Sequence, residues 1–400
     1  MIEQHRQSIP ALQQTINGKP MVYVDWAATS QMPDCVIHSV CEAMMLRGNV
    51  RRGVHNLGAH RADLLEQARS RIARFIGATS SGLVLTTGTT DGLNRLVQSI
   101  GETLSPADVV LLSAVEHHAH LLPWQRMAQR YGFGIEIVPT NAHGRIDLAI
   151  LTRLISQHNV KVFGFPMVSN VLGSVQPIRE IMDAVRSKGI RVVVDAAQAV
   201  AHMPIDVAEL GVDALVFGGH KIYGPTGTGV LWIREDWLSD LSPTVVGGGS
   251  IQSASYTDFE VAKGVYGFEP GTPNVSGFIG LARAIMWMKE IGWKEILRQE
   301  KLLCDCLRVE LSQIPEIRLL NPQPDIPLFT FEVDGLHAHD LGTLLDQEGI
   351  IVRTGHHCTQ PFHDVLGIDS STRISLSFLN TQEECAYVIQ TLQRILGEFI

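Results

Sequence analysis

A lysine and an aspartate stand where two apolar segments of this chain end. Lys221 follows the run at 214–217 and opens a glycine-rich stretch that reaches Gly229, whereas Asp195 ends the run that begins at Val192. A lysine held at the end of a strand and partly desolvated has the lowered pKa that Schiff-base chemistry needs. An aspartate is the usual residue that keeps a pyridine nitrogen protonated. Together the two residues indicate pyridoxal phosphate (PLP) chemistry.

A threonine-rich segment directly precedes a helical pattern and is a candidate phosphate site. Thr89 and Thr90 lie between Gly88 and Gly92, and apolar residues repeat at helical spacing from Leu93 onward. Backbone amides and hydroxyls at the start of a helix can bind a phosphate, and the helix dipole adds to that attraction. A threonine in this place also serves as an ordinary N-cap, so the segment gains its meaning from the lysine and the aspartate.

Three histidines, His117, His118 and His120, follow an apolar run at 109–112. A flat imidazole in this place can stack on the aromatic ring of a cofactor and assist proton transfer. The alternative is a zinc site, because His117 and His120 are three residues apart and a second cluster lies at 356–358. Zinc needs further ligands, and the sequence has no CxxC or HExxH pattern. We therefore expect no metal, and we expect His118 and His120 to be structural or solvated.

A single cysteine, Cys358, has surroundings that suit a reactive thiol. Gly355 and Pro361 bracket the segment, so we expect a mobile loop. The neighbouring His356 and His357, if protonated, would favour the thiolate. A cysteine on such a loop can reach a substrate and then carry its product outward. The cysteines that we interpret as ordinary thiols are Cys35, Cys41, Cys304, Cys306 and Cys385.

Arg373 begins a strand-like segment in which apolar and polar residues alternate. Ile374, Leu376 and Phe378 share one face, so Arg373 should lie away from the buried apolar face. Taken alone, this pattern predicts a solvated guanidinium. Beside a PLP site, the same guanidinium can bind the carboxylate of an amino acid with two hydrogen bonds.

Composition bounds the class of protein. The 400 residues are 45% hydrophobic and 18% charged, which is typical of a soluble globular protein with more than one domain. A formal charge of −9 argues against binding to nucleic acid or to an anionic membrane. We see no signal peptide and no apolar stretch of membrane-spanning length. Six scattered cysteines do not form a disulfide framework, so we expect a cytoplasmic protein.

Apolar runs that alternate with helical patterns predict the sheet that positions these residues. A helix is predicted between two of the runs, where apolar residues repeat from Ile178 to Val185 and Gly189 follows. This alternation is typical of a parallel sheet covered by helices on both faces, with ligands at the carboxyl ends of the strands. The runs lie at 109–112, 162–165, 192–194 and 214–217.

The last hundred residues have a different pattern. Strands with one buried face are predicted around 329–333 and 374–378, with helices around 341–345 and after 381 and a proline-rich loop at 321–327. This indicates a smaller α+β domain. We divide the chain into an N-terminal segment that packs with the small domain (1–20), a large PLP-binding domain (21–275), a connecting helix (276–300) and the small C-terminal domain that carries the cysteine loop (301–400).

From Asp25 to about Asn380 the chain resembles, in collinear order, group II cysteine desulfurases of the SufS/CsdA type, which are class V aminotransferase relatives with the fold-type I PLP architecture. This resemblance implies an α/β fold with a mostly parallel seven-stranded sheet. The segments that carry it are Thr87-Gly-Thr-Thr90, Glu116-His-His-Ala119, Val168-Ser-Asn-Val-Leu-Gly173, Val194-Asp-Ala-Ala-Gln198, Gly219-His-Lys-Ile-Tyr-Gly-Pro-Thr-Gly-Thr-Gly229, Glu269-Pro-Gly-Thr-Pro-Asn274, Arg353-Thr-Gly-His-His-Cys358 and Arg373-Ile-Ser375.

The resemblance implies which residues carry out the reaction and which bind the substrate. Lys221 would hold the cofactor as a Schiff base and later move the α-proton of the substrate. His117 would stack on the ring, Arg373 would bind the substrate carboxylate with Asn170 nearby, and Cys358 would be the nucleophile. Catalytic residues are thus expected to be Lys221, Cys358 and His117.

The resemblance also implies how the cofactor is held. Asp195 would pair with the ring nitrogen and Gln198 with the phenolic oxygen, while His220 would bind the phosphate. Thr272 would reach the phosphate from the partner subunit of a homodimer. The full set of expected cofactor-binding residues is Thr89, Thr90, His117, Asn170, Asp195, Gln198, His220, Lys221 and Thr272.

The activity that the resemblance implies is the conversion of L-cysteine to L-alanine. Sulfur would leave on Cys358 as a persulfide and pass to an acceptor protein of the SufE/CsdE type. The alternatives are a selenocysteine lyase, a cysteine sulfinate desulfinase, another class V aminotransferase-type reaction, or a non-catalytic sulfur-relay protein. A NAD enzyme is excluded because no GxGxxG opens a βαβ unit.

Three positions depart from the pattern of the family. Gly218 stands where a serine is usual, so one phosphate hydroxyl is missing. Trp26 occupies a position that is usually small, and Arg51 replaces a histidine near the mouth of the site. We expect these changes to affect cofactor affinity, substrate preference or turnover.

Overall fold

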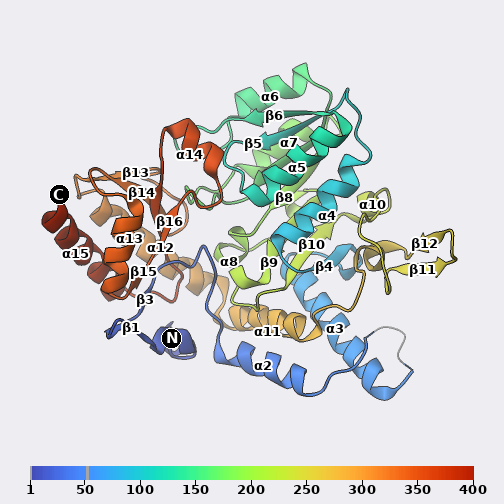
Figure 1. The fold of residues 1–400 in the computed structure, drawn as a ribbon, viewed down its shortest axis with the longest axis horizontal. Coiled ribbons are helices and arrows are strands. Elements are labelled where there is room, and N and C mark those ends of the chain that lie inside the picture. The colour runs from blue at the N-terminus through green and yellow to red at the C-terminus, as the bar shows by residue number, and fades with distance from the viewer. Residues whose placement is uncertain (1, 51–53) are drawn as a thin grey trace.

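The computed structural model describes residues 2–50 and 54–400, so Arg51 lies outside the described residues. Within them, seven strands form one sheet at the centre of the large part (Figure 1). Strand β10 runs antiparallel to both of its neighbours, and the other pairs are parallel. The order across the sheet is β4 (Leu83–Thr86), β10 (Gly229–Ile233), β9 (Ala214–Gly218), β8 (Arg191–Asp195), β7 (Val160–Pro166), β5 (Val109–Ser113) and β6 (Gly134–Val138). The predicted sheet is confirmed.

Helices cover both faces of this sheet, as predicted. One face packs against α4 (Thr89–Gly101) and α5 (His118–Tyr131). The other packs against α3 (Asn56–Phe75), α6 (Leu148–Gln157), α7 (Ile178–Arg186) and α11 (Val275–Ile291). Strands β9 and β10 are apolar and buried along their whole length because both of their faces are covered, whereas the edge strand β6 exposes Ile137. Helix α2 (Asp34–Met45) lies outside α11.

The smaller part is built on four strands of the described chain in the order β13 (Ile317–Leu319), β14 (Leu328–Val333), β17 (Ser371–Ser375) and β16 (Arg353–Gly355). Its core contains α12 (Trp293–Leu311), α13 (Ala338–Gln347) and α15 (Gln382–Phe399). The helical region after 275 is two helices, because the chain turns at Gly292, which has a φ of +85°. The expected strand at 374–378 is β17, which ends earlier, at Ser375.

Two segments from the first half of the chain contact the smaller part. Strand β3 (Val22–Tyr23) pairs with β15 (Ile350–Ile351), and Arg6 of α1 (Ile2–Gln7) forms an ion pair with Glu384. The proposed division at residues 20, 275 and 300 stays a prediction. Its first boundary falls close to β3, which pairs with β15 of the smaller part in a separate two-stranded sheet.

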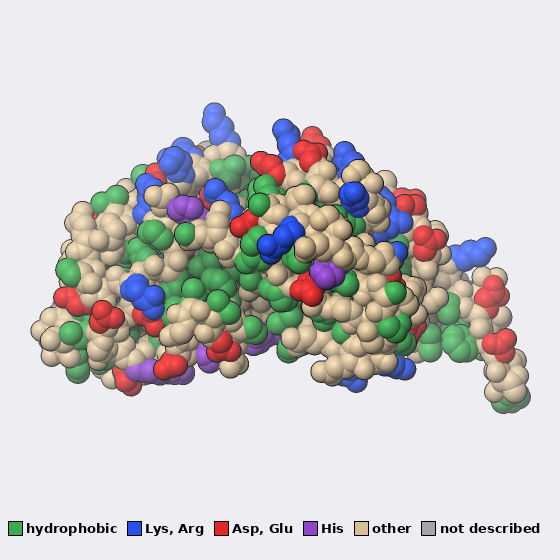
Figure 2. Space-filling view, turned by 90° about the horizontal axis from the view of Figure 1, so that it is seen from above, with side chains coloured by type: hydrophobic (Ala, Val, Ile, Leu, Met, Phe, Trp, Pro, Cys, Tyr) green, Lys and Arg blue, Asp and Glu red, His purple; other side chains and the backbone are tan. Residues whose placement is uncertain are grey.

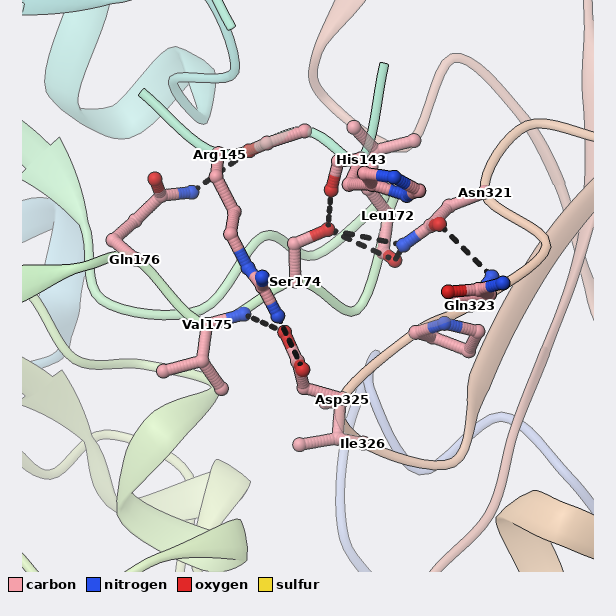
Figure 3. A network of polar contacts seen from close by, with 12 residues as sticks. His143, Arg145, Leu172, Ser174, Val175, Gln176, Asn321, Gln323, Asp325 and Ile326 are labelled. Carbon is pink, nitrogen blue, oxygen red and sulfur yellow. Dashed lines mark hydrogen bonds and ion pairs between the residues drawn. The ribbon is translucent and has the colours of Figure 1, made fainter. Parts of the chain in front are cut away.

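The proline-rich loop at 321–327 docks the small part onto the large one (Figure 3). Asn321 donates hydrogen bonds to the Leu172 carbonyl at 2.8 Å and to the Ser174 hydroxyl at 3.1 Å. Asp325 pairs with Arg145 at 2.7 Å and accepts a bond from the amide of Val175. This network holds the 170–175 segment, so it also positions Asn170.

A short hairpin of β11 (Ile251–Ala254) and β12 (Phe259–Val261) projects from the body at the right of both views (Figures 1 and 2). Over the rest of the face in Figure 2, Lys and Arg side chains are scattered among Asp and Glu side chains. None of the helices within the described ranges combines the length and apolar character needed to cross a bilayer.

Candidate active site

A cavity of about 490 Å³ lies at the carboxyl ends of the parallel strands, between the two parts of the chain. This is where ligands are expected in an open α/β sheet. Its wall brings together residues that are far apart in the sequence. The predicted site residues that line it are Thr89, Thr90, His117, Asn170, Asp195, Gln198, His220, Lys221, Cys358 and Arg373.

Lys221 ends the 3₁₀ turn that follows β9, so the strand delivers its side chain to the cavity. Its Nζ donates a hydrogen bond to the carbonyl of Ala27. Burial, helped by the charge of Arg373, lowers the pKa of Lys221 to about 7. A substantial fraction of the amine is therefore neutral, and nucleophilic, at physiological pH.

Asp195 is the last residue of β8 and is 5% exposed. One carboxylate oxygen accepts the amide of Ala197 at 2.8 Å, which leaves the other oxygen for a ligand. Burial raises the pKa of Asp195 to about 6. Gln198 donates to the Ala27 carbonyl at 2.9 Å, so Lys221 and Gln198 meet at one backbone oxygen.

The start of α4 forms a cradle around Thr89. The Thr89 hydroxyl is buried and has no hydrogen-bond partner among residues 2–50 and 54–400. A Cβ at Gly218 would lie 3.1 Å from that hydroxyl, so the glycine keeps the cradle open. Burial and the charge of Lys221 hold the pKa of His220 at about 4, so its imidazole is neutral. An unpaired hydroxyl at a helix start, opposite Asp195 and Lys221, fits a phosphate-bearing pyridine aldehyde.

His117 is the N-cap of α5 and accepts the amide of Ala119 on Nδ1 at 3.0 Å. Its proton therefore resides on Nε2. Burial lowers the pKa of His117 to about 4, and Lys221 adds to that effect. The result is a neutral, flat ring in the cavity wall, which suits stacking.

Arg373 is only 2% exposed, so the expectation of a solvated guanidinium is wrong. All residues of β17 are buried, because the core of the small part covers one face and the large part covers the other. Arg373 pairs with Asp25 at 3.2 Å and donates to the Asn170 carbonyl at 2.9 Å. Its Nε finds no partner within the described part of the chain, so the group retains a donor for a ligand carboxylate.

The loop that carries Cys358 follows β16 and is held against the large part. Asn170 donates to the carbonyl of His357 at 2.7 Å, and the amide of His118 donates to the carbonyl of Cys358 at 2.8 Å. His357 and Cys358 both have left-handed φ angles, of 51° and 57°. Such angles are unfavourable for residues other than glycine and need support from the surroundings. The thiol is exposed. The mobility of the loop stays a prediction.

The expected role of His357 in activating this thiol is wrong. Its side chain is buried, and its Nε2 bonds to the Ser371 hydroxyl at 3.0 Å. Burial lowers the pKa of His357 to about 2, so this imidazole carries no charge at neutral pH. Electrostatic help for the Cys358 thiolate must therefore come from groups other than His357, and the help expected from His356 stays a prediction.

Two residues at the site had no role assigned to them from the sequence: Arg353, which lines the cavity, and Asp25, which contacts the wall residue Arg373. Asp25 contacts Arg373, and burial raises the pKa of the Asp25 carboxyl in spite of that contact. Arg353 is opposite Arg373 in the pairing of β16 and β17 and lines the cavity. Arg353 could have been found from the sequence, because it lies in the same segment as Cys358. The role of Asp25 had no local signal, because the contact spans the whole chain.

Other predicted positions lie elsewhere. Thr272 and Trp26 are not among the described residues that line the cavity. Trp26 packs on Tyr23 and Tyr223 in the core, with ring centroids 5.2 and 5.8 Å away. Its size is therefore accommodated behind the wall. In the portion of the chain that the structure describes, no group of three or more His, Cys, Asp or Glu side chains could hold a metal ion.

Comparisons with known proteins agree on one family. The model of the aminotransferase class V family matches residues 22–388. A probable cysteine desulfurase of Vibrio cholerae is 39% identical over 393 residues, covering 97% of each chain. The apo structure of cysteine desulfurase from Thermococcus onnurineus superposes with a TM-score of 0.91 at 34% identity, covering 98% of each chain. The cysteine desulfurase CsdA (S-sulfonic acid) from Escherichia coli gives a TM-score of 0.91 at 32% identity, covering 100% of this chain and 99% of the other.

Proposed function

Because this chain belongs to the aminotransferase class V family, we propose that its cavity performs the reaction of the cysteine desulfurases that it resembles. The enzyme is a cysteine desulfurase of the SufS/CsdA type, which takes sulfur from L-cysteine and leaves L-alanine. The observation that carries the assignment is the meeting of Lys221 and Cys358 in one cavity, one from each part of the chain. A lysine alone would suit many PLP reactions, whereas sulfur transfer also needs a thiol.

The cofactor is held by residues that fit its parts. The Thr89 and Thr90 end of α4, with His220, would bind the phosphate, and Asp195 would hold the proton on the ring nitrogen. Gln198 would contact the phenolic oxygen. Thr89 would supply the hydroxyl that Gly218 lacks. Bound PLP supplies an aldehyde that captures the substrate amine and a ring that accepts the electrons of its Cα–H bond.

The protein positions the substrate and moves its protons. Arg373 would bind the carboxylate through the donor on Nε, with Asn170 beside it. The Lys221 amine, with its pKa of about 7, can accept the α-proton at Nζ and later return it. His117 covers one face of the ring site and remains neutral.

Cys358 receives the sulfur. Its thiolate forms a bond to the sulfur of the substrate while the substrate Cβ–S bond breaks, and the electron pair of that bond stays with the carbon fragment. Protonation of the fragment gives alanine, and Cys358 retains a persulfide. The terminal sulfur then passes to an acceptor thiol by exchange-type attack. The exposed position of the loop leaves the persulfide within reach of an acceptor.

The test compares three substrates on the PLP-loaded enzyme. We expect alanine from L-cysteine, and we expect the Cys358→Ser variant to lose this activity by more than about a hundredfold. The matched control is Cys41→Ser, which removes another exposed thiol away from the cavity. L-Selenocysteine or L-cysteine sulfinate as the preferred substrate would favour the corresponding lyase or desulfinase. Unchanged alanine release by Cys358→Ser would overturn the sulfur-transfer role.

The functional unit that we propose is a homodimer in the cytoplasm with an acceptor protein of the SufE/CsdE type. The projecting hairpin exposes Tyr256 and Phe259, at 110% and 52% exposure, which suits burial against a second copy. Thr272 is exposed and outside its own cavity, so it can serve the site of the partner. Six free cysteines suit a reducing compartment. Analytical ultracentrifugation of wild type and Tyr256→Asp tests the dimer.

A further inference from the structure

A buried histidine and glutamate lie behind the cavity without a role in the reaction described above. His120 is 0% exposed and Glu116 is 2% exposed, and His120 Nδ1 is 3.0 Å from Glu116 Oε2. The other two polar atoms, His120 Nε2 and Glu116 Oε1, have no hydrogen-bond partner in the ranges that the structure covers. A buried ion pair with unsatisfied polar atoms contributes little to stability, because the cost of desolvation offsets the attraction between the charges. Such a pair calls for another explanation.

The sheet register places His120 next to Asp195. The imidazole lies over Gly164 of β7, so closely that a Cβ there would be 2.5 Å from His120 Cε1. Gly164 is opposite Val193 of β8, and Asp195 is two residues further along the same strand. Residues two apart point to the same face of a sheet. His120 therefore packs on the face from which the Asp195 carboxylate projects, one pleat behind it.

The charges around Asp195 show which member of the Glu116–His120 pair acts more strongly on its carboxylate. Although burial disfavours the imidazolium, the Glu116 carboxylate raises the pKa of His120 above its ordinary value. Burial raises the pKa of Asp195, whereas the Ala197 amide, the His120 cation and Lys221 lower it. The effect of His120 on the Asp195 pKa outweighs the opposing effect of Glu116. The pair thus presents its positive end to Asp195.

We propose that Glu116 and His120 form a positioning pair that keeps Asp195 ionised, so that the shared proton stays on the ring nitrogen of PLP. The proposal rests on the proposed function, because it deepens the role of Asp195 at that same site. When a cation lies behind a carboxylate, the ion pair with a pyridinium is favoured over the neutral pair in which the carboxyl holds the proton. Gly164 makes the arrangement possible, because any side chain there would displace the imidazole.

The test reads the proton on the cofactor rather than activity. The enzyme is loaded with PLP labelled with ¹⁵N in the ring, and the ¹⁵N chemical shift is measured in wild type and in His120→Asn. We expect the signal of the variant to move toward the unprotonated value, with a change of about tenfold in the ratio of the two proton positions. We also expect the dissociation constant for PLP to rise about tenfold, as for other residues that orient a ligand-binding side chain.

The matched control is a second buried pair of the same chemistry. His202 Nδ1 is 2.9 Å from Glu300 Oε1, and neither residue is among the main groups that set the pKa of Asp195. His202→Asn should lower stability without moving the ring-nitrogen signal. If His120→Asn does not fold, Glu116→Gln should move the signal in the same direction, because it removes the anion that keeps His120 protonated. A ring-nitrogen signal unchanged in both variants would overturn the proposal.

Failure of the proposed function has a different signature. A wild-type protein that takes up no PLP would contradict the proposed function. The titration of the His120 imidazole, followed by its NMR signals, would still test whether Glu116 and His120 act as a pair. In the cofactor-free protein, we expect the pKa of His120 to lie above its ordinary value in wild type and to be lower in Glu116→Gln than in wild type. Titration at the same pH in both proteins would contradict the pair itself.

Discussion

The clearest structural prediction concerns Gly164, in strand β7 under His120. In Gly164→Ala the new Cβ would lie 2.5 Å from His120 Cε1, 2.8 Å from His120 Nε2 and 2.9 Å from Leu112 Cδ2. Strands β5 and β8 hold β7 on both sides, so the backbone has little freedom to move away. The imidazole must therefore shift, and its bond to Glu116 must lengthen or break.

The magnitude follows from these two changes. Adding a methyl group to a packed core costs about 1–3 kcal/mol. Loss of a hydrogen bond to a charged group costs about 1.5–3 kcal/mol more, and the lower chain entropy of the unfolded alanine variant returns about 0.4–1 kcal/mol. We expect Gly164→Ala to lower the free energy of unfolding by about 2–4 kcal/mol. In the His120→Asn background the shorter side chain leaves room, so the same substitution should cost less than about 1 kcal/mol.

The assay is guanidinium unfolding of PLP-saturated protein, followed by far-UV circular dichroism at one protein concentration for all variants. The four members of the double-mutant cycle give the coupling between Gly164 and His120, expected at about 2 kcal/mol. Gly397→Ala in α15 is the control, because a Cβ there would meet no atom within 4 Å among the described residues. It should stabilise the helix by about 0.5–1 kcal/mol. An equal cost of Gly164→Ala in both backgrounds would refute the packing argument.

Three further predictions follow from buried polar groups. The neutral form of the Lys221 amine reacts with an aldehyde, so the rate of PLP uptake by cofactor-free protein should rise with pH and level off above the Lys221 pKa of about 7. A rate that still rises tenfold per pH unit at pH 9 would contradict the lowered pKa. Glu269 and Glu66 both pair with Arg69, but the Glu269 side chain is 3% exposed and the Glu66 side chain is 43% exposed. In urea unfolding, Glu269→Gln should therefore lower the free energy of unfolding by about 3–5 kcal/mol and Glu66→Gln by less than about 1 kcal/mol. Equal losses in the two variants would contradict the burial argument. Thr89→Val should raise the dissociation constant for PLP about tenfold, as measured by fluorescence titration. The melting temperature of the cofactor-free protein should not fall, because the Thr89 hydroxyl has no hydrogen-bond partner among the described residues. An unchanged affinity for PLP would exclude this hydroxyl from the phosphate site.

Most of the framework could be predicted from the sequence, because the signals are local. Four apolar runs correspond to β5, β7, β8 and β9, and the helical spacing from Ile178 corresponds to α7. Since parallel strands share one edge for their carboxyl ends, the positions of Lys221 and Asp195 at two such ends already placed them close together. The fold and the lysine–aspartate core of the site were therefore within reach of the sequence.

The protonation states of the site depended on tertiary contacts. Alternation along β17 shows that Arg373 and Ile374 point in opposite directions, but it does not show that the large part covers Arg373 as well. Nor does the segment around Cys358 reveal that His357 is buried and neutral. His120 was expected to be structural or solvated, and only the sheet register placed it over Gly164, behind Asp195.

The sequence by itself thus determined which residues stand at the ends of which elements, because periodicity and glycine placement act within a few neighbouring residues. Only the tertiary structure decided which polar groups lose water and which charges face them. Those contacts join segments separated by tens to hundreds of residues, as between Asp25 and Arg373. The cost of desolvation and the nearby charges set each pKa, and both depend on the whole packed molecule.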